Sequence, residues 1–234
     1  MSDAELLAAV EKSPQATAAH DKAAWVGLFT EDGRIEDPVG SRPHIGHAQI
    51  GRFYDTFIGP RQITFHRDLD IVSGTTVVRD LTLEIMLGSV VLLVPTFIRY
   101  DLSHVEKDWR ISSLRAYWEL PSMVAQFLRQ GAKAVPATLQ LSAGLVRHQR
   151  IVGTAGFASG FRGVGRRGKR LVAEALEAGR LGDVTYRPAH KIIASGSTVA
   201  AIVATPSGPG VLFAELDGRE IRDASVFCSA TDQE

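Results

Sequence analysis

The sequence predicts an α+β protein, with a curved antiparallel sheet packed on helices, in two tandem copies of which the second is degenerate. Apolar residues at helical spacing dominate the first 57 residues, and alternating apolar and polar residues then dominate residues 63–120. A strand-like segment of the same pattern returns after residue 184. Helices followed by a run of strands are typical of α+β domains, whereas α/β domains alternate the two.

Composition narrows the class of protein. A chain of 234 residues with 45% apolar residues fits one or two domains with sizeable cores. Its zero net charge argues against nucleic acid or an anionic membrane as a partner. The opening MSDAELLAAVEK lacks the basic region of a secretion signal, and the longest apolar run, residues 90–98, is too short to span a bilayer. We therefore expect a cytoplasmic protein.

The first part of the chain reads as helices around one short strand. Pro14 cannot donate a backbone hydrogen bond, so it is expected to kink or divide the first helix. A later helix has one apolar stripe of Ile50, Phe53, Tyr54 and Phe57. The expected helices are residues 3–19, 22–29 and 47–57, and the expected strand is residues 34–37.

A meander of four strands follows. Ser-Gly and Gly-Ser pairs mark two of its turns, and a longer polar loop marks the third. A short helix and a linker, punctuated by Gly131 and Pro136, complete this part. The expected strands are residues 63–74, 75–87, 89–102 and 108–120. We place the domain boundary near residue 131, giving domains 1–130 and 131–234.

The second part repeats the first in outline. ITFHRDLDIVSGTTVV (63–78) lies beside VTYRPAHKIIASGSTVA (184–200), and a predicted helix at 165–179 precedes the second copy. Chance similarity between strand-forming segments is the alternative. Residues 1–130 carry a net charge of −4 and residues 131–234 one of +4. We expect the two halves to associate as an intramolecular pseudo-dimer, and the sequence leaves open whether the protein is a monomer or a homodimer.

The segment IEDPVG (35–40) carries the clearest candidate for chemistry. Ile35 and Asp37 share one strand face, so a buried Ile35 implies an inward Asp37, and Pro38 helps to end the strand there. Apolar walls raise a carboxyl pKa towards the range of a general base. Ordinary turn chemistry before a proline and a glycine is the competing interpretation.

The stretch IEDPVGSRPHIGHAQIGRFYDTF resembles the ketosteroid isomerases. They share the nuclear transport factor 2-like fold with the SnoaL-like polyketide cyclases and scytalone dehydratase. The likeness runs from about residue 16 to residue 118. It implies a cone-shaped α+β barrel that opens on an apolar cavity, an apolar small-molecule ligand such as a steroid or polyketide, and chemistry without a cofactor.

The resemblance also implies roles for individual residues. Asp37 matches the aspartate that shuttles the proton, Tyr54 matches a tyrosine that supports the oxyanion site, and Trp118 matches a cavity aromatic. The usual oxyanion tyrosine falls at Ser13, and the acid that assists it falls at Thr96 or Phe97, depending on the alignment. The expected catalytic residues are Asp37, Tyr54 and Thr96, and the expected ligand-binding residues are Ser13, Phe53, Phe57, His66, Phe97 and Trp118.

Two further functions remain open. Limonene-epoxide hydrolases of the same fold activate water with an Asp–Arg–Asp set, which Arg79 and Asp80 faintly resemble, but Ala116 stands where the second aspartate would be. The other is a binding protein that keeps the cavity without the chemistry. Asp37 discriminates it from an enzyme, because binding alone needs no base there.

Several polar residues have a plainer interpretation. His66 alternates with polar neighbours, so a solvated sheet surface is the simpler expectation. His44 and His47 are expected to cap the following helix or to gate the pocket. The basic cluster of Arg162, Arg166, Arg167, Lys169 and Arg170 is expected to be a solvated face, a contact with the acidic first half or a site for an anionic group. No His, Cys or carboxylate set has metal-ligand spacing, so no metal is expected.

Overall fold

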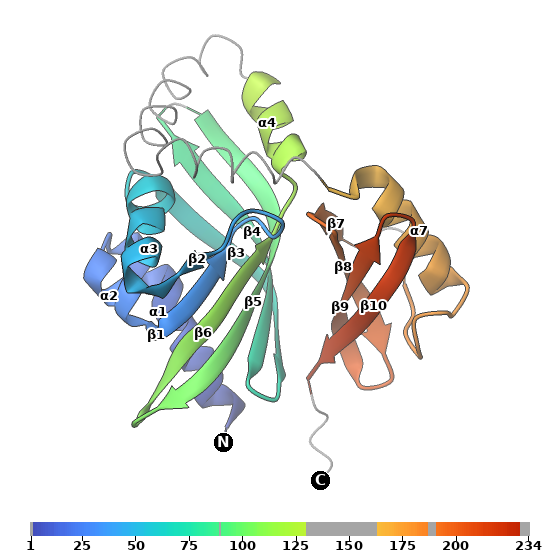
Figure 1. Cartoon of the computed structure of the whole chain (residues 1–234), viewed down its shortest axis with the longest axis horizontal. Helices are drawn as coiled ribbons and strands as arrows, with labels where there is room; N and C mark the ends of the chain where they lie inside the picture. The colour runs from blue at the N-terminus through green and yellow to red at the C-terminus, as the bar shows by residue number, and fades with distance from the viewer. Residues whose placement is uncertain (1, 89, 130–162, 187–190, 230–234) are drawn as a thin grey trace.

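The computed structural model describes residues 2–88, 90–129, 163–186 and 191–229. We call residues 2–129 the first unit and residues 163–229 the second unit. Figure 1 shows helices α1–α3 on one side, two facing sheets in the middle and helix α7 on the far side. The predicted boundary near residue 131 lies outside the described residues.

The helices of the first unit follow the prediction with shifted ends. They are α1 (Asp3–Ala18), α2 (Lys22–Gly27), α3 (Gly46–Phe53), the π-helical turn η1 (Tyr54–Ile58) and α4 (Leu120–Arg129). Ser2 and Glu5 form a capping box at the start of α1, and Pro14 does not divide this helix. The helix expected at 22–29 ends early because Phe29 already pairs with Ile111 as a strand residue.

The first sheet contains the predicted meander and a parallel pair that was not predicted. Its strands are β1 (Phe29–Glu36), β2 (His44–Ile45), β3 (Gln62–Ser73), β4 (Thr76–Leu87), β5 (Val90–Val105) and β6 (Asp108–Tyr117). Their order in the sheet is β2-β1-β6-β5-β4-β3. Strand β6, the last strand of the meander, lies beside β1 and runs parallel to it. The sheet is therefore not purely antiparallel.

The second unit is a smaller antiparallel meander with one helix. It contains α7 (Gly165–Glu177), β7 (Ile192–Ser195), β8 (Thr198–Thr205), β9 (Gly208–Asp217) and β10 (Glu220–Cys228), with strand order β10-β9-β8-β7. The two Ser-Gly repeats form matching hairpins, because Ser73 pairs with Thr76 and Ser195 pairs with Thr198. Both predicted repeat segments therefore lie at the first hairpin of a meander.

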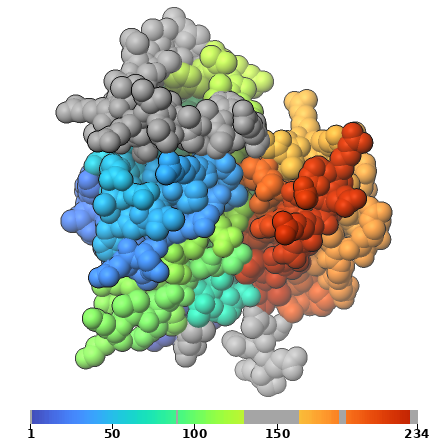
Figure 2. All heavy atoms as spheres, viewed as in Figure 1, coloured from blue at the N-terminus to red at the C-terminus, as the bar shows by residue number. Residues whose placement is uncertain are grey.

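Strand β5 separates two hydrophobic cores. Val94, Ile98 and Tyr100 face the core shared with the helices, whereas Phe97 faces the second sheet. The Tyr117 and Phe213 rings meet in this second core with their centroids 4.6 Å apart. Its buried members are Val39, Ile71, Val78, Phe97 and Tyr117 from the first unit and Ile193, Ala200, Val211 and Phe213 from the second. The two units abut in the space-filling view (Figure 2).

Ion pairs reinforce the contact between the units. Lys191 Nζ donates to the Asp80 carboxylate and, at 2.8 Å, to the Leu81 carbonyl oxygen. Lys169 Nζ lies 2.6 Å from Glu119 Oε1. Both pairs join a basic residue of the second unit to an acidic residue of the first. One member of the predicted basic cluster, Lys169, thus makes the expected contact with the acidic half.

Candidate active site

An apolar pocket of about 110 Å³ lies inside the first unit. The π-helical turn η1, strands β3–β5 and helix α4 form its walls. Among the described residues, Asp37 and Arg61 are the two charged ones that line it. The other lining residues are Phe53, Phe57, Ile58, Ile63, Leu83, Ile85, Leu87, Val94, Trp118 and Met123. A carboxylate in such surroundings loses hydration without gaining much polar contact in return.

Asp37 follows β1 directly and is joined to Pro38 by a cis peptide bond. Trp118 Nε1 donates a hydrogen bond to Asp37 Oδ1 at 2.6 Å, and the described residues provide no other hydrogen bond to this carboxylate. Burial raises the pKa of Asp37 to about 6, against the lowering effect of the Trp118 bond. The side chain is half-buried, with its remaining accessibility at the pocket it lines. At neutral pH the carboxylate can take a proton and return it readily.

The backbone around Asp37 is fixed from within the first unit. Val39 N–H donates to the Ala116 carbonyl oxygen at 2.8 Å, and Gly40 N–H donates to Glu36 Oε1 at 2.9 Å. The first bond ties the loop after β1 to β6, and Trp118 follows β6 directly. The end of β1 and the end of β6 therefore present Asp37 and Trp118 to each other.

Arg61 is a pocket residue that the sequence did not identify. Its Nη1 donates to the Thr56 carbonyl oxygen at 2.6 Å, and its guanidinium carbon lies 5.9 Å from the centroid of the Phe57 ring. Burial lowers the pKa of Arg61 to about 10, so the guanidinium stays charged. Within the described part of the chain it has no carboxylate partner. A signal was available: a basic residue stands between the aromatic helix stripe and the first strand of the meander.

The structure brings four of the predicted site residues together at the pocket: Asp37, Phe53, Phe57 and Trp118. Ser13, Tyr54 and Thr96 are buried but do not line it. Ser13 Oγ accepts a hydrogen bond from Trp25 Nε1 at 3.1 Å, and Thr96 Oγ1 donates to the Val94 carbonyl oxygen at 2.9 Å. The Tyr54 hydroxyl is buried without a hydrogen-bond partner among the described residues. The expected oxyanion donors are thus away from Asp37.

Two predicted ligand contacts point away from the pocket. Phe97 lies on the outer face of β5, where Lys191 Nζ is 5.1 Å from its ring centroid. His66 is exposed, and its Nε2 lies 2.8 Å from Glu84 Oε2. Strand alternation explains both positions, because Thr96 and Phe65 turn inward and their neighbours must turn outward. The solvated-surface interpretation of His66 fits this position.

The residues of the epoxide-hydrolase alternative do not meet at the pocket either. Buried Arg79 binds Asp70, with Nε 2.8 Å from Oδ1, and Glu11, with Nη2 3.0 Å from Oε2. Asp80 binds Lys191 of the second unit. Neither Arg79 nor Asp80 lines the pocket of Asp37. Arg79 thus forms ion pairs within the first unit, and Asp80 forms one between the units.

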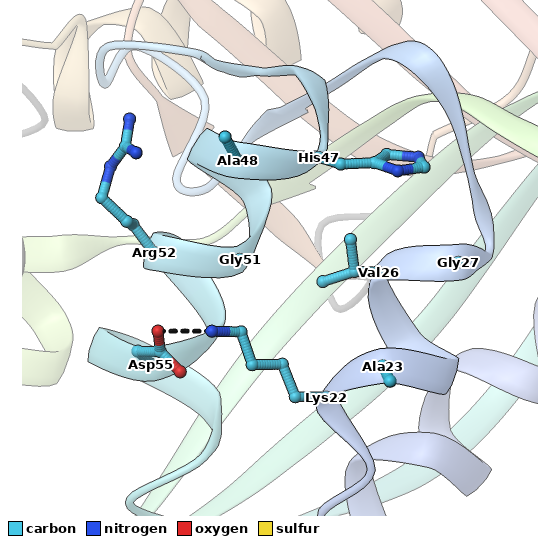
Figure 3. Close-up of a pocket in the computed structure, with 9 residues that line it drawn as sticks. All are labelled: Lys22, Ala23, Val26, Gly27, His47, Ala48, Gly51, Arg52 and Asp55. Atoms are coloured by element: carbon cyan, nitrogen blue, oxygen red, sulfur yellow. Dashed lines mark hydrogen bonds and ion pairs between the residues drawn. The ribbon is translucent and has the colours of Figure 1, made fainter.

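A second hollow of about 510 Å³ lies between α2 and α3 (Figure 3). Lys22 spans it to reach Asp55, with Nζ 2.6 Å from Oδ2, and His47 stands at its other end. His47 Nε2 lies 3.1 Å from the Phe29 carbonyl oxygen, so this nitrogen donates. Neither His44 nor His47 caps α3, which begins without a side-chain cap. Small and apolar residues make up most of the described lining of this hollow, and its carboxylate, Asp55, is already paired with Lys22.

The parts of the chain that the structure describes contain neither a bilayer-crossing helix nor a metal-binding cluster. None of the helices in those parts of the chain has both the length and the apolar character needed to cross a bilayer. In the same parts, no group of three or more His, Cys, Asp or Glu side chains could hold a metal ion.

Comparison with known proteins identifies the first unit. The SnoaL-like domain family matches residues 10–100. A steroid Delta-isomerase of Nocardioides simplex is 30% identical over 121 residues, which cover 52% of this chain and 95% of that protein. A Δ5-3-ketosteroid isomerase structure from Mycobacterium sp. is 26% identical, with a TM-score of 0.47 over 51% of this chain and 96% of its own. The structure of RV0760c from Mycobacterium tuberculosis is 25% identical, with a TM-score of 0.48, and the match covers 53% of this chain and 96% of that one. Through its first unit, the chain belongs to the SnoaL-like family that includes the steroid Delta-isomerases.

Proposed function

We propose that the first unit is a cofactor-independent proton-transfer enzyme (an isomerase, cyclase or dehydratase) whose general base is Asp37. The observation that carries this proposal is a carboxyl group that lines an apolar pocket and accepts one hydrogen bond from the described residues, through one oxygen. Burial in this setting raises the pKa of Asp37 to about 6. The proposed substrate is an apolar, oxygenated small molecule. The 30% identity to a steroid Delta-isomerase makes steroids the first class to test, with polyketides next.

The proposed reaction moves one proton. The free oxygen of Asp37 takes a proton from a carbon next to the substrate carbonyl, and the electron pair of that C–H bond moves into an enolate. The proton then returns from Asp37 to a different carbon, so the double bond shifts and no atom is lost. Trp118 holds the other carboxylate oxygen throughout, which keeps the base in one orientation.

Enolate formation needs a donor near the substrate oxygen, and we propose Arg61 for this role. It is the charged donor in the pocket lining, whereas Ser13, Tyr54 and Thr96 lie outside it. A donor of this kind typically contributes about 10²–10³ in rate. Arg61 also keeps N–H groups available, because its one hydrogen bond to a described residue, the Thr56 carbonyl, uses only Nη1.

The size of the pocket constrains ligand entry. Its 110 Å³ is below the roughly 300–1,000 Å³ typical of pockets for drug-sized ligands. A steroid would therefore have to displace flexible lining side chains, of which unbranched Met123 on α4 is the most adaptable. Binding is expected to open the pocket between α4 and the sheet.

A non-catalytic binding protein is the second candidate, favoured because the expected oxyanion donors Ser13, Tyr54 and Thr96 do not line the pocket. An absorbance assay for conjugated enone formation from a Δ5-3-ketosteroid separates the two. We expect Asp37→Asn to lower turnover by about 10²–10⁴ while tryptophan fluorescence still reports ligand binding. Asp55→Asn, at the surface hollow, is the matched control and should retain turnover. Equal turnover in wild type and Asp37→Asn contradicts the proposed base, and binding without turnover in wild type supports the binding protein.

We also infer that the second unit is a degenerate copy of the first and pairs with it as a pseudo-dimer. The matching hairpins and the shared strand order of the two meanders support a duplication. The shared core of nine buried residues and the two ion pairs support the pairing. Independent unfolding of the two units would contradict it.

A further inference from the structure

We propose that the tip of the β7–β8 hairpin and Lys169 of α7 hold the two segments that bear Asp37 and Trp118, so that Lys169, Ser195 and Gly196 are positioning residues for the base. This inference rests on the proposed function, because it assigns a role in that same site. It goes further in giving the second unit, whose described residues do not line the pocket, a part in the reaction.

The first contact is with the loop that follows Asp37. Ser195 Oγ donates a hydrogen bond to the Val39 carbonyl oxygen at 3.0 Å, and both residues are buried. The adjacent Gly196 abuts Gly40, since a Cβ added to Gly40 would lie 2.5 Å from Gly196 Cα. The backbones of the two units thus meet three residues after the carboxylate. Displacement of this hairpin would free the loop on its outer side.

The second contact is with the segment that contains Trp118. Glu119 Oε1 accepts hydrogen bonds from Lys169 Nζ at 2.6 Å and from Ala194 N–H at 3.1 Å. Burial disfavours the Glu119 carboxylate, but these bonds outweigh it and lower its pKa. Tyr117, on the other side of Trp118, packs against Phe213 of the second sheet. Both neighbours of Trp118 are held from outside while its indole turns inward to Asp37.

One short piece of chain makes both contacts. Ala194, Ser195 and Gly196 are consecutive, and they touch Glu119, Val39 and Gly40 in that order. The Gly196 carbonyl oxygen also accepts from Val164 N–H at 3.0 Å, which ties the hairpin to the start of α7. The hairpin therefore bridges the ends of β1 and β6, and the bond from Trp118 to Asp37 spans the same two ends on the pocket side.

We expect these contacts to influence the pKa of Asp37 through Trp118. The Trp118 hydrogen bond favours the ionised form of Asp37. Loosening the segment that contains Trp118 should weaken this bond, raise the pKa of Asp37 and shift the acidic limb of the pH–rate profile to higher pH. A role confined to stability would lower the amount of folded protein without moving the profile.

The test uses the full chain with Lys169→Met and Ser195→Ala, which remove the two contacts independently. Arg170→Met is the matched control for the first, because Arg170 is an exposed neighbour on α7. Ser73→Ala is the control for the second, because Ser73 holds the equivalent place in the β3–β4 hairpin and is partly exposed. The readouts are the pH dependence of enone formation and the Asp37 titration followed by carbon-13 NMR, with Asp37→Asn to assign the signal.

We expect each positioning variant to raise the Asp37 pKa and to lower kcat at pH 7 by about 2- to 10-fold, the range for one hydrogen bond, with KM little changed. Lys169→Arg should restore the profile, and both controls should match wild type. Folded Lys169→Met and Ser195→Ala proteins with an unchanged Asp37 titration would overturn the proposal. Should Asp37→Asn keep its turnover, the proposed base fails, yet the NMR titration still decides whether the second unit controls this carboxyl group.

Discussion

The two hairpins of matching sequence have the same backbone but different surroundings. Gly74 and Gly196 adopt φ of +58° and +57°, the left-handed region that favours glycine. A Cβ added to Gly74 would meet no atom within 4 Å, whereas one added to Gly196 would lie 2.6 Å from Gly40 Cα. The turn chemistry is shared, but only the second hairpin abuts the segment after the candidate base. The turn at Gly74 has open space around the glycine, whereas the turn at Gly196 forms a contact between the two units.

The sheets differ in the same way. The first sheet has one face towards helices and pocket and the other towards the second unit. Its outer face is exposed at Val91 and Leu93 but fully covered at Phe97, on the same strand. The second unit thus covers the part of this face nearest to the ends of β1 and β6. Substitutions inside the covered part should therefore lower the free energy of unfolding more than substitutions outside it.

The largest expected effect is at the shared core. Phe213→Ala should lower the free energy of unfolding by about 3–5 kcal/mol, because Phe213 is buried between the sheets and its loss leaves a cavity. Urea unfolding followed by circular dichroism measures it. Val91→Ala, on the uncovered part of the same face, should cost about 0.5 kcal/mol or less. Equal costs, or two separate transitions in the wild type, would contradict a shared core.

The next effect is a pH dependence of stability that comes from Asp37 in the pocket. The folded-state pKa of Asp37, about 6, exceeds its ordinary value of 3.8, so the folded protein binds more protons than the unfolded chain between these pH values. Stability should therefore fall as pH rises from about 4 to 7, by up to about 3 kcal/mol from this group. Asp37→Asn removes that part of the pH dependence. Urea titrations of both proteins at pH 4.5 and 7 measure it, and identical slopes would contradict the raised pKa.

The smallest effect compares the two turn glycines directly. Gly74→Ala should cost about 1 kcal/mol, the penalty for a side chain in the left-handed region with open space around it. Gly196→Ala adds a backbone clash with Gly40, so we expect roughly 2–3 kcal/mol. Thermal melts of the two variants give the difference. Equal melting temperatures would mean that the two hairpins are equivalent and that the Gly40 contact carries no energy.

Sequence patterns predicted the meander well because its strands alternate clearly and two of its three turns carry Ser-Gly or Gly-Ser. They failed where distant pairing decided the outcome. Phe29 belongs to a strand because Ile111 lies beside it, and the parallel pairing of β1 with β6 cannot be read from either segment alone. Pro14 remains within a single α1, although local propensity favours a break.

Residues at the pocket could be predicted where the periodicity of a single strand or helix determines which way a side chain points. Asp37, Phe53, Phe57 and Trp118 line the pocket as expected from alternation, helical spacing and resemblance. Phe97 packs against the second sheet, because strand alternation turns it away from its inward neighbours. Arg61 was missed although its place between the aromatic helix stripe and the first meander strand was a signal, because the direction of its side chain depends on how the helix packs on the sheet. The contacts of Ser195 and Gly196 depend on packing between distant segments.

The bond from Ser195 to Val39 also sets an order of events during synthesis. It joins residues 156 positions apart, whereas the bond from Trp118 to Asp37 spans 81 positions. A ribosome adding about 5–20 residues per second needs roughly 8–30 s to travel from Val39 to Ser195. During that interval the base can meet its indole partner and the loop after it can bond to Ala116 and Glu36, but the loop still lacks its contact with Ser195. A growing chain therefore assembles its pocket first and receives the external support for it last.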